Sequence, residues 1–265
     1  MLNRVFYILI FSLVFNLYSS QNKALNIKAL YEMEIDRNNT FKSGSNPKVD
    51  CDMYIEDGIS RFIVKYQEAY AIYPGQFISY NVSVYKDFNK NEMYGRAIGY
   101  KANNYVIKDS LNIIDWKLQD STKIINGKNC KLATVHWRGF DWEAWYDEDI
   151  TVSDGPFKLH GLPGLIIEAK AKACGGSNYY FRLKNIDFLE TSLKDKLGFP
   201  YSKEVFTFID YPTFYKDDSE SILKNLKNNY LRGQEEMSNS KPDIVLGPSC
   251  MSSLSFDDCF CYPTK

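Results

Sequence analysis

The chain has 265 residues, including 20 tyrosines and 17 phenylalanines, and its formal net charge is −1. A balance of 32 basic against 33 acidic residues, without a basic block, excludes the electrostatic footprint of a nucleic-acid-binding protein. The length suits one large domain or two smaller ones, and the many aromatic residues favour β-strands.

The chain begins with the pattern of a secretory signal peptide. Arg4 precedes an apolar run from Val5 to Phe15, and the small residues Ser19 and Ser20 follow. The run is short for a membrane span, and an N-terminal anchor is the alternative. No cysteine follows the run, as a lipoprotein would require. We expect cleavage after Ser20 and a periplasmic or secreted protein with no integral membrane span after cleavage.

Short runs of alternating polarity come next, separated by turn dipeptides. Asp57-Gly58 and Asn126-Gly127 are the clearest hairpin signals, because these residue types accept the positive φ angles of tight hairpin turns. The expected strands cover residues 27–37, two runs within 49–73, and then 77–88, 93–100, 103–108, 113–125 and 130–138.

The stretch 137–173 contains three of the four tryptophans and one of the two histidines. Its first half predicts a strand over residues 142–147, because side chains of alternating character point to opposite faces of a strand. Trp142 and Tyr146 share one face of this strand, and Trp145 lies on the other.

A turn and a second strand follow in the same stretch. Gly161-Leu162-Pro163-Gly164 predicts a type II turn, in which Pro163 fixes φ at the second position and Gly164 takes φ > 0 at the third. Residues 165–173 alternate between apolar and mostly charged side chains, which indicates a strand with one solvated face.

These residues resemble the GLPGLI family of exported proteins from Gram-negative bacteria. The family's signature hexapeptide stands unchanged at Gly161–Ile166. Three further matches lie upstream: Asn126-Gly127-x-x-Cys130-x-x-Ala133, Ala144-Trp145-Tyr146 and Gly155-Pro156. Thr151 departs from the family, which usually has proline after Ile150. The resemblance is dense from 124 to 168, and it implies export and a fold; the family has no established activity.

The pattern changes after residue 178. Residues 179–188 predict a last long strand, and residues 218–232 predict a helix with one apolar stripe. Asp217 and Glu220 stand at capping-box spacing before this helix, and Gly233 is placed to end it.

The fold expected from these elements is mainly β, a large curved antiparallel sheet or open half-barrel with one C-terminal helix. Residues 1–20 form the signal peptide, and residues 21–237 form the antiparallel domain with the helix. Residues 238–265 form a cysteine-rich irregular tail.

The even number of cysteines in an exported chain favours disulfide bonds. The six candidates are Cys51, Cys130, Cys174, Cys250, Cys259 and Cys261. Six cysteines allow 15 pairings, and spacing cannot choose among them, although Cys259 and Cys261 are too close to pair comfortably. The alternative is a soft-metal site built from Cys250, Met251, Cys259 and Cys261.

The search for catalytic motifs finds no nucleophile elbow, zinc-protease helix or phosphate-binding glycine loop. Only His136 and His160 can act as bases near neutral pH. His160 directly precedes the glycine turn, where its side chain can reach a cleft. The acidic residues 147–149 could bind a hard cation or assist His160, or they form a solvated turn. We expect no cofactor and no metal.

The candidate ligand-binding residues are Arg138, Trp142, Trp145, Tyr146 and His160. Since only one face of a single sheet can be the packed core, a groove contains Trp145 or the Trp142–Tyr146 pair, not both. We expect Arg138 to flank this groove.

Two functions from different classes fit the sequence. The first is an extracytoplasmic, non-catalytic binding or carrier protein that holds an apolar ligand or a peptide on a curved sheet. The second is an extracytoplasmic hydrolase that uses His160 with an acidic residue of the turn 147–149. The absence of catalytic motifs favours the first.

Overall fold

The computed structural model describes residues 26–36, 48–65, 70–73, 76–78, 83–98, 104–112, 114–173, 178–214, 216–217, 220, 224, 251–252 and 259–260. Most of these residues form one large sheet. Its strands are β1 (Asn26–Asp36), β2 (Lys48–Glu56), β3 (Ile59–Val64), β6 (Ser83–Asp87), β7 (Glu92–Ile98), β8 (Asn104–Ser110), β9 (Lys117–Ile125), β10 (Lys128–Trp137), β11 (Phe140–Asp147), β12 (Leu165–Ala173), β13 (Asn178–Leu189) and β14 (Thr207–Asp210).

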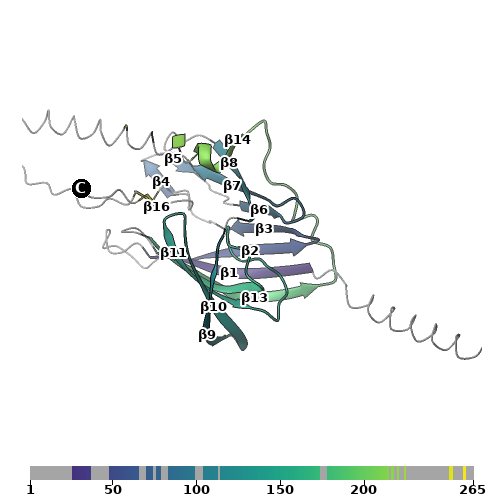
Figure 1. The fold of residues 1–265 in the computed structure, drawn as a ribbon. Coiled ribbons are helices and arrows are strands. Elements are labelled where there is room, and N and C mark those ends of the chain that lie inside the picture. Colours follow the sequence, from purple (N-terminus) through teal and green to yellow (C-terminus); the bar gives the residue numbers. More distant parts are fainter. Residues whose placement is uncertain are drawn as a thin grey trace, which may run out of the picture.

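The twelve strands follow the order β14-β8-β7-β6-β3-β2-β1-β13-β12-β11-β10-β9 (Figure 1). All neighbours are antiparallel except β14, which runs parallel to β8. Two small ladders stand apart, β4 (Tyr70–Tyr73) with β5 (Gln76–Ile78) and β15 (Met251–Ser252) with β16 (Cys259–Phe260). The mainly β, open antiparallel sheet expected from the sequence is confirmed.

The C-terminal helix is described only in part. Residues 211–214, 216, 217, 220 and 224 are helical, so helical structure begins before the expected residue 218. The rest of the expected helix and Gly233 lie outside the described residues, as does the expected signal peptide. No helix within the described ranges is both long and apolar enough to cross a membrane.

Three hairpin turns share one backbone geometry. Asp57-Gly58 has φ angles of 52° and 75°, and Asn126-Gly127 has 52° and 77°, as the dipeptides predicted. Arg138-Gly139 adopts 52° and 74°. The third turn was not expected, because arginine is not a usual residue at positive φ.

One face of the sheet is packed, and the other is solvated over β11 but covered over β2, where Leu193 and Leu197 bury Tyr54. Along β11 the side chains of Phe140, Trp142 and Ala144 are buried, whereas those of Asp141 and Glu143 are exposed, as strand geometry requires. We call the side of the sheet that carries Trp142 the covered face, and the opposite side the open face.

The β11–β12 connection, residues 148–164, packs on the covered face, and we call it the covering loop. Its apolar side chains Phe157, Leu159 and Leu162 belong to the same buried cluster as those of the strands. Phe157 stacks on Phe181 of β13, with ring centroids 6.3 Å apart and an interplanar angle of 10°. The loop therefore supplies the second layer of the core.

Lys86 of β6 anchors the covering loop. Its ammonium is fully buried and donates hydrogen bonds to Asp154 Oδ1 at 2.5 Å and to the carbonyl oxygens of Gly155 and Leu159 at 2.9 Å each. All three ammonium protons have acceptors, so the buried charge is compensated. Burial lowers the pKa of Lys86, and Asp154 opposes that shift.

The glycine-rich motif ends the covering loop in a way that corrects the expected turn. Gly161 has φ of 89°, whereas Gly164 does not have a positive φ, so the type II turn with Gly164 at the left-handed position is wrong. Gly164 is needed for a different reason. A Cβ at this position would lie 2.2 Å from the carbonyl oxygen of Asp147, so only glycine lets the two segments pass this closely.

Two cysteines depart from the disulfide expectation. Cys51 of β2 and Cys130 of β10 are buried free thiols, and four strands separate them in the sheet. Burial raises the pKa of both thiols, that of Cys130 to about 11, which keeps them protonated. The side chains of the other four cysteines lie outside the described residues.

Candidate functional site

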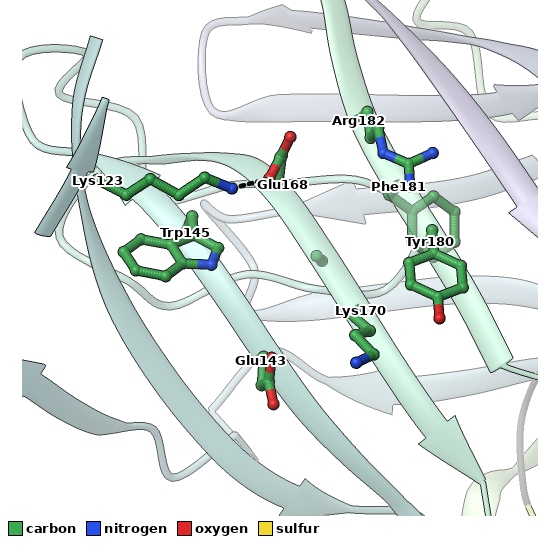
Figure 2. Close-up of a pocket in the computed structure, with 9 residues that line it drawn as sticks. Lys123, Glu143, Trp145, Glu168, Lys170, Tyr180, Phe181 and Arg182 are labelled. Carbon is green, nitrogen blue, oxygen red and sulfur yellow. Dashed lines mark hydrogen bonds and ion pairs between the residues drawn. The ribbon is translucent and has the colours of Figure 1, made fainter. Parts of the chain in front are cut away.

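A pocket of about 230 Å³ lies on the open face, over β11, β12 and β13 (Figure 2). Two aromatic rings and five charged side chains line it, with Ala169 and Phe181 below them. The charged and aromatic lining residues are Lys123, Glu143, Trp145, Glu168, Lys170, Tyr180 and Arg182.

The first side of the pocket is built around Trp145. The Lys123 ammonium lies 5.4 Å from the centroid of the indole ring and 3.0 Å from Glu168 Oε2 (Figure 2). Lys123 comes from β9, which the sheet order places two strands away from β11. At the tip of the β9–β10 hairpin, Asn126 donates a hydrogen bond to the carbonyl oxygen of Leu183 on β13 at 3.1 Å. This contact ties the hairpin tip to β13.

The second side is built around Tyr180 of β13. The Lys170 ammonium lies 5.9 Å from the centroid of the phenol ring, and the Arg182 guanidinium lies 5.4 Å from it. Arg182 also pairs with Glu34 of β1 at 2.9 Å. Because cations over an aromatic face are attracted to its quadrupole, both charged groups are held next to the ring.

The register of β11 and β12 sets acids beside bases at the centre of the pocket. Glu143 lies opposite Lys170, and Trp145 lies opposite Glu168. Side chains at opposite positions of antiparallel strands are neighbours on one face. The Glu143 carboxylate is exposed and has no ion pair or hydrogen bond within the described part of the chain, so it is available to a ligand.

These groups can bind a ligand through charge, hydrogen bonds and aromatic contact. The pocket offers ammonium and guanidinium donors, carboxylate acceptors and two rings, and its lining contains no histidine, cysteine or serine. Across the described residues, no three histidine, cysteine, aspartate or glutamate side chains are grouped so that they could hold a metal ion.

The structure separates the three expected aromatic residues of β11. Trp145 lines the pocket, whereas Trp142 and Tyr146 are 5% and 1% exposed. Trp142 packs against Phe140 and stacks on Phe181, at centroid distances of 6.0 and 6.5 Å. Of the two alternatives for a groove, only the one with Trp145 coincides with this pocket.

Arg138 is not among the residues that line the pocket. It lies in the β10–β11 turn, forms an ion pair with Asp109, and stacks its guanidinium 3.6 Å from the ring centroid of Tyr211. Its side chain thus joins the turn to β8 and to the start of the helical segment.

His160 is a structural residue of the covering loop and is only 2% exposed. One ring nitrogen, Nδ1, lies 2.8 Å from the Lys158 carbonyl oxygen, and the other, Nε2, contacts that of Leu111. Burial and the nearby Lys86 lower the pKa of His160. With both nitrogens directed at carbonyl oxygens, neither is directed at the acidic turn 147–149.

The acidic turn has structural partners of its own. Asp147 is buried, lies 3.4 Å from Lys128 Nζ, and accepts a hydrogen bond from the Asp149 main-chain nitrogen at 3.1 Å. Glu148 pairs with Lys131 at 2.6 Å. The other histidine, His136, is exposed and contacts Asp141 at 2.7 Å.

Besides Ala169 and Phe181 at the base of the pocket, the sequence did not indicate six lining residues: Lys123, Glu143, Glu168, Lys170, Tyr180 and Arg182. Alternation placed Glu168 and Lys170 on the solvated face of their strand and said nothing of a site there. Their convergence depends on two facts that alternation does not contain, the pairing of β12 with β13 and the position of the β9–β10 hairpin tip.

Several solved structures are similar to this chain. The structure of PNGF-II in space group C2 matches with a TM-score of 0.48 and 18% identity, over 73% of this chain and 32% of that one. The chain thus spans about a third of the length of PNGF-II. The MucA/MucB complex of Pseudomonas aeruginosa matches with a TM-score of 0.32 and 12% identity, over 65% of this chain and 56% of that one.

The LolA superfamily protein NE2245 from Nitrosomonas europaea matches with a TM-score of 0.29 and 4% identity, over 67% of this chain and 91% of that one. No curated protein matches the sequence. A family model described as a protein of unknown function (Porph_ging) matches residues 138–168, the segment that contains β11, the covering loop and the start of β12.

Proposed function

We propose that this chain is a non-catalytic binding protein of the extracytoplasmic space, and that it holds a polar ligand in the pocket beside Trp145. The observation that carries the proposal is the set of charged and aromatic side chains that neighbouring contacts hold around one open hollow. Among them stands the Glu143 carboxylate, which has no ion pair or hydrogen bond with any residue that the structure describes. Preorganised polar groups around half-buried rings are what a binding site needs.

The packing of the covered face argues against an apolar ligand, one of the two ligand classes expected from the sequence. An apolar ligand held against that face would have to displace Phe157, Leu159 and Leu162, which are 6%, 0% and 1% exposed. The open-face pocket is lined mainly by charged groups, whose desolvation by an apolar molecule is unfavourable. A polar ligand, such as a peptide or a polyhydroxylated molecule, suits the pocket better.

The hydrolase hypothesis has no support in the geometry, because the ring nitrogens of His160 contact carbonyl oxygens and its side chain is buried. Export is supported by the pattern of Arg4, the apolar run and the small residues before Gln21. The proposed ligand is therefore one that occurs outside the cytoplasm.

Native mass spectrometry tests the proposal. Protein exported by a Gram-negative host is incubated with the small-molecule fraction of the periplasm and sprayed from volatile buffer. We expect an added mass on the wild type and on a control variant, Phe188→Ala, which truncates another exposed aromatic side chain. Trp145→Ala should lose that mass. A wild type without any added mass, or a Trp145→Ala variant that keeps it, contradicts the proposal.

A further inference from the structure

The lining of the pocket indicates which chemical class of ligand it takes. We infer that the ligand is a neutral saccharide, which contacts Trp145 and Tyr180 with its carbon-bound faces and hydrogen bonds the flanking acid–base pairs with its hydroxyl groups. This inference rests on the proposed binding function and adds the ligand class to it.

The pocket is balanced in charge. The three cations that line it are Lys123, Lys170 and Arg182, and the carboxylates beside them are Glu143, Glu168 and Glu34 of β1. Lys123 is paired with Glu168, and Arg182 with Glu34. A neutral ligand leaves both pairs intact, and the other two lining charges, Glu143 and Lys170, are opposite in sign, so the pocket as a whole favours neither an anion nor a cation.

Hydroxyl groups fit this arrangement because each one donates and accepts hydrogen bonds. An ammonium next to a carboxylate, as at Lys123–Glu168, presents a donor and an acceptor side by side. Glu143 and Lys170 lie at opposite positions of β11 and β12 without an ion pair between them, so they also present an acceptor and a donor to a ligand. Adjacent hydroxyls of a sugar ring can accept from the base and donate to the acid of one pair, with charge-assisted strength.

The two rings are placed to hold a ligand of some length. Trp145 stands on β11 and Tyr180 on β13, with one strand between them, which corresponds to roughly 10 Å across the sheet. Their apolar surfaces carry partial negative charge and attract the slightly positive C–H groups of a sugar face. A ligand that spans both rings is larger than one sugar ring.

A peptide fits the same surface less well. Strand β12 lies inside the sheet and pairs with β11 and β13, so its main-chain groups at the pocket are used in the two ladders. Peptides that add to sheets bind at an edge, where main-chain groups are free. A peptide lying across this face would keep its own amide groups without main-chain partners.

Isothermal titration calorimetry with defined probes tests the inference. The neutral probes are cello-, manno-, xylo- and chito-oligosaccharides, and the comparison probes are oligogalacturonates and a mixed pool of short peptides. We expect at least one neutral oligosaccharide to bind the wild type with little dependence on salt, since no net charge is neutralised. Trp145→Ala should weaken this binding about tenfold or more.

A matched pair of lysine variants tests the contacts without altering the aromatic residues. Lys170→Met should weaken binding about fivefold, as the loss of one hydrogen bond to a charged group implies. Lys172→Ala removes an exposed lysine of the same strand that does not line the pocket and should leave binding unchanged. Equal effects of the two lysine variants, or tighter binding of peptides or oligogalacturonates than of every neutral probe, overturn the inference.

The mass-spectrometric test keeps the two proposals distinguishable. An added mass that depends on Trp145 but is not a carbohydrate leaves the binding function standing and overturns the saccharide. Absence of both the added mass and any titration signal overturns both.

Discussion

A substitution at Gly164 tests whether the glycine is needed because its main chain lies against that of Asp147. Gly164→Ala places a Cβ 2.2 Å from the carbonyl oxygen of Asp147 and 2.6 Å from its carbonyl carbon. Ordinary contacts begin near 3.4 Å, so the main chain at Asp147 must retreat by about 1.2 Å. Overpacking and the loss of a ladder hydrogen bond where Asp147 meets Leu165 together cost about 2–4 kcal/mol.

Two other glycines serve as comparisons. Gly161→Ala meets no atom closer than 3.9 Å but forces alanine to φ of 89°, which costs about 1–2 kcal/mol. Gly198→Ala has neither a neighbour within 4 Å nor a positive φ, so it should be neutral or slightly stabilising. The expected order of destabilisation is Gly164→Ala, then Gly161→Ala, then Gly198→Ala.

Urea and thermal unfolding measure this order. For a protein of this size we expect Gly164→Ala to lower Tm by roughly 5–15 °C. A Gly164→Ala variant as stable as Gly198→Ala would refute the close approach as the reason for glycine. A Gly161→Ala variant less stable than Gly164→Ala would show that positive φ is the stronger constraint in this loop.

Three further predictions concern buried groups. Lys86→Met should lower the free energy of unfolding by about 3–5 kcal/mol, because Asp154 is left buried without its partner. In urea denaturation, the double variant with Asp154→Leu should recover part of this loss. No recovery would contradict the role of Lys86 in holding the covering loop. Burial and Lys86 lower the pKa of His160 below its usual 6.5, so below that pH the unfolded chain binds a proton that the folded chain excludes, and stability falls as pH falls. His160→Gln should reduce the difference in unfolding free energy between about pH 7.5 and about pH 5.5, and an unchanged difference would refute this origin. Trp142→Ala should cost about 3–5 kcal/mol in thermal unfolding and Trp145→Ala only about 1 kcal/mol; equal costs would contradict the assignment of the two faces.

Much of the sheet could be predicted from the sequence because turn dipeptides and alternating polarity are local patterns. Asp57-Gly58 and Asn126-Gly127 need positive φ, and they fixed two hairpins to the residue. Alternation in 165–173 placed charged residues on one face. The hairpin turn at Arg138-Gly139 was not predicted, because arginine does not favour the φ of 52° that Arg138 adopts there.

Of the residues that line the pocket, only Trp145 was a candidate from the sequence. Both faces of β11 carry aromatic residues, and the local pattern cannot tell which face the covering loop packs against. Lys123 and Arg182 are 59 positions apart in the chain, and only the strand order brings their strands near one pocket. His160 looked available because it precedes a turn, yet it is buried and contacts Leu111 and Trp116 of the segment between β8 and β9.

The position of β1 within the sheet has a consequence for how the chain folds. β1 lies between β2 and β13, so the earliest of the described strands pairs along its length with a strand made about 150 residues later. The antiparallel series β1–β8 and the series β9–β12 can each form from neighbouring segments. They join only when β13 closes against β1 on one side and β12 on the other. While the chain is being made, the edges of β1 and β12 therefore stay unpaired until residues 178–189 emerge. During that interval, edge-to-edge aggregation competes with folding.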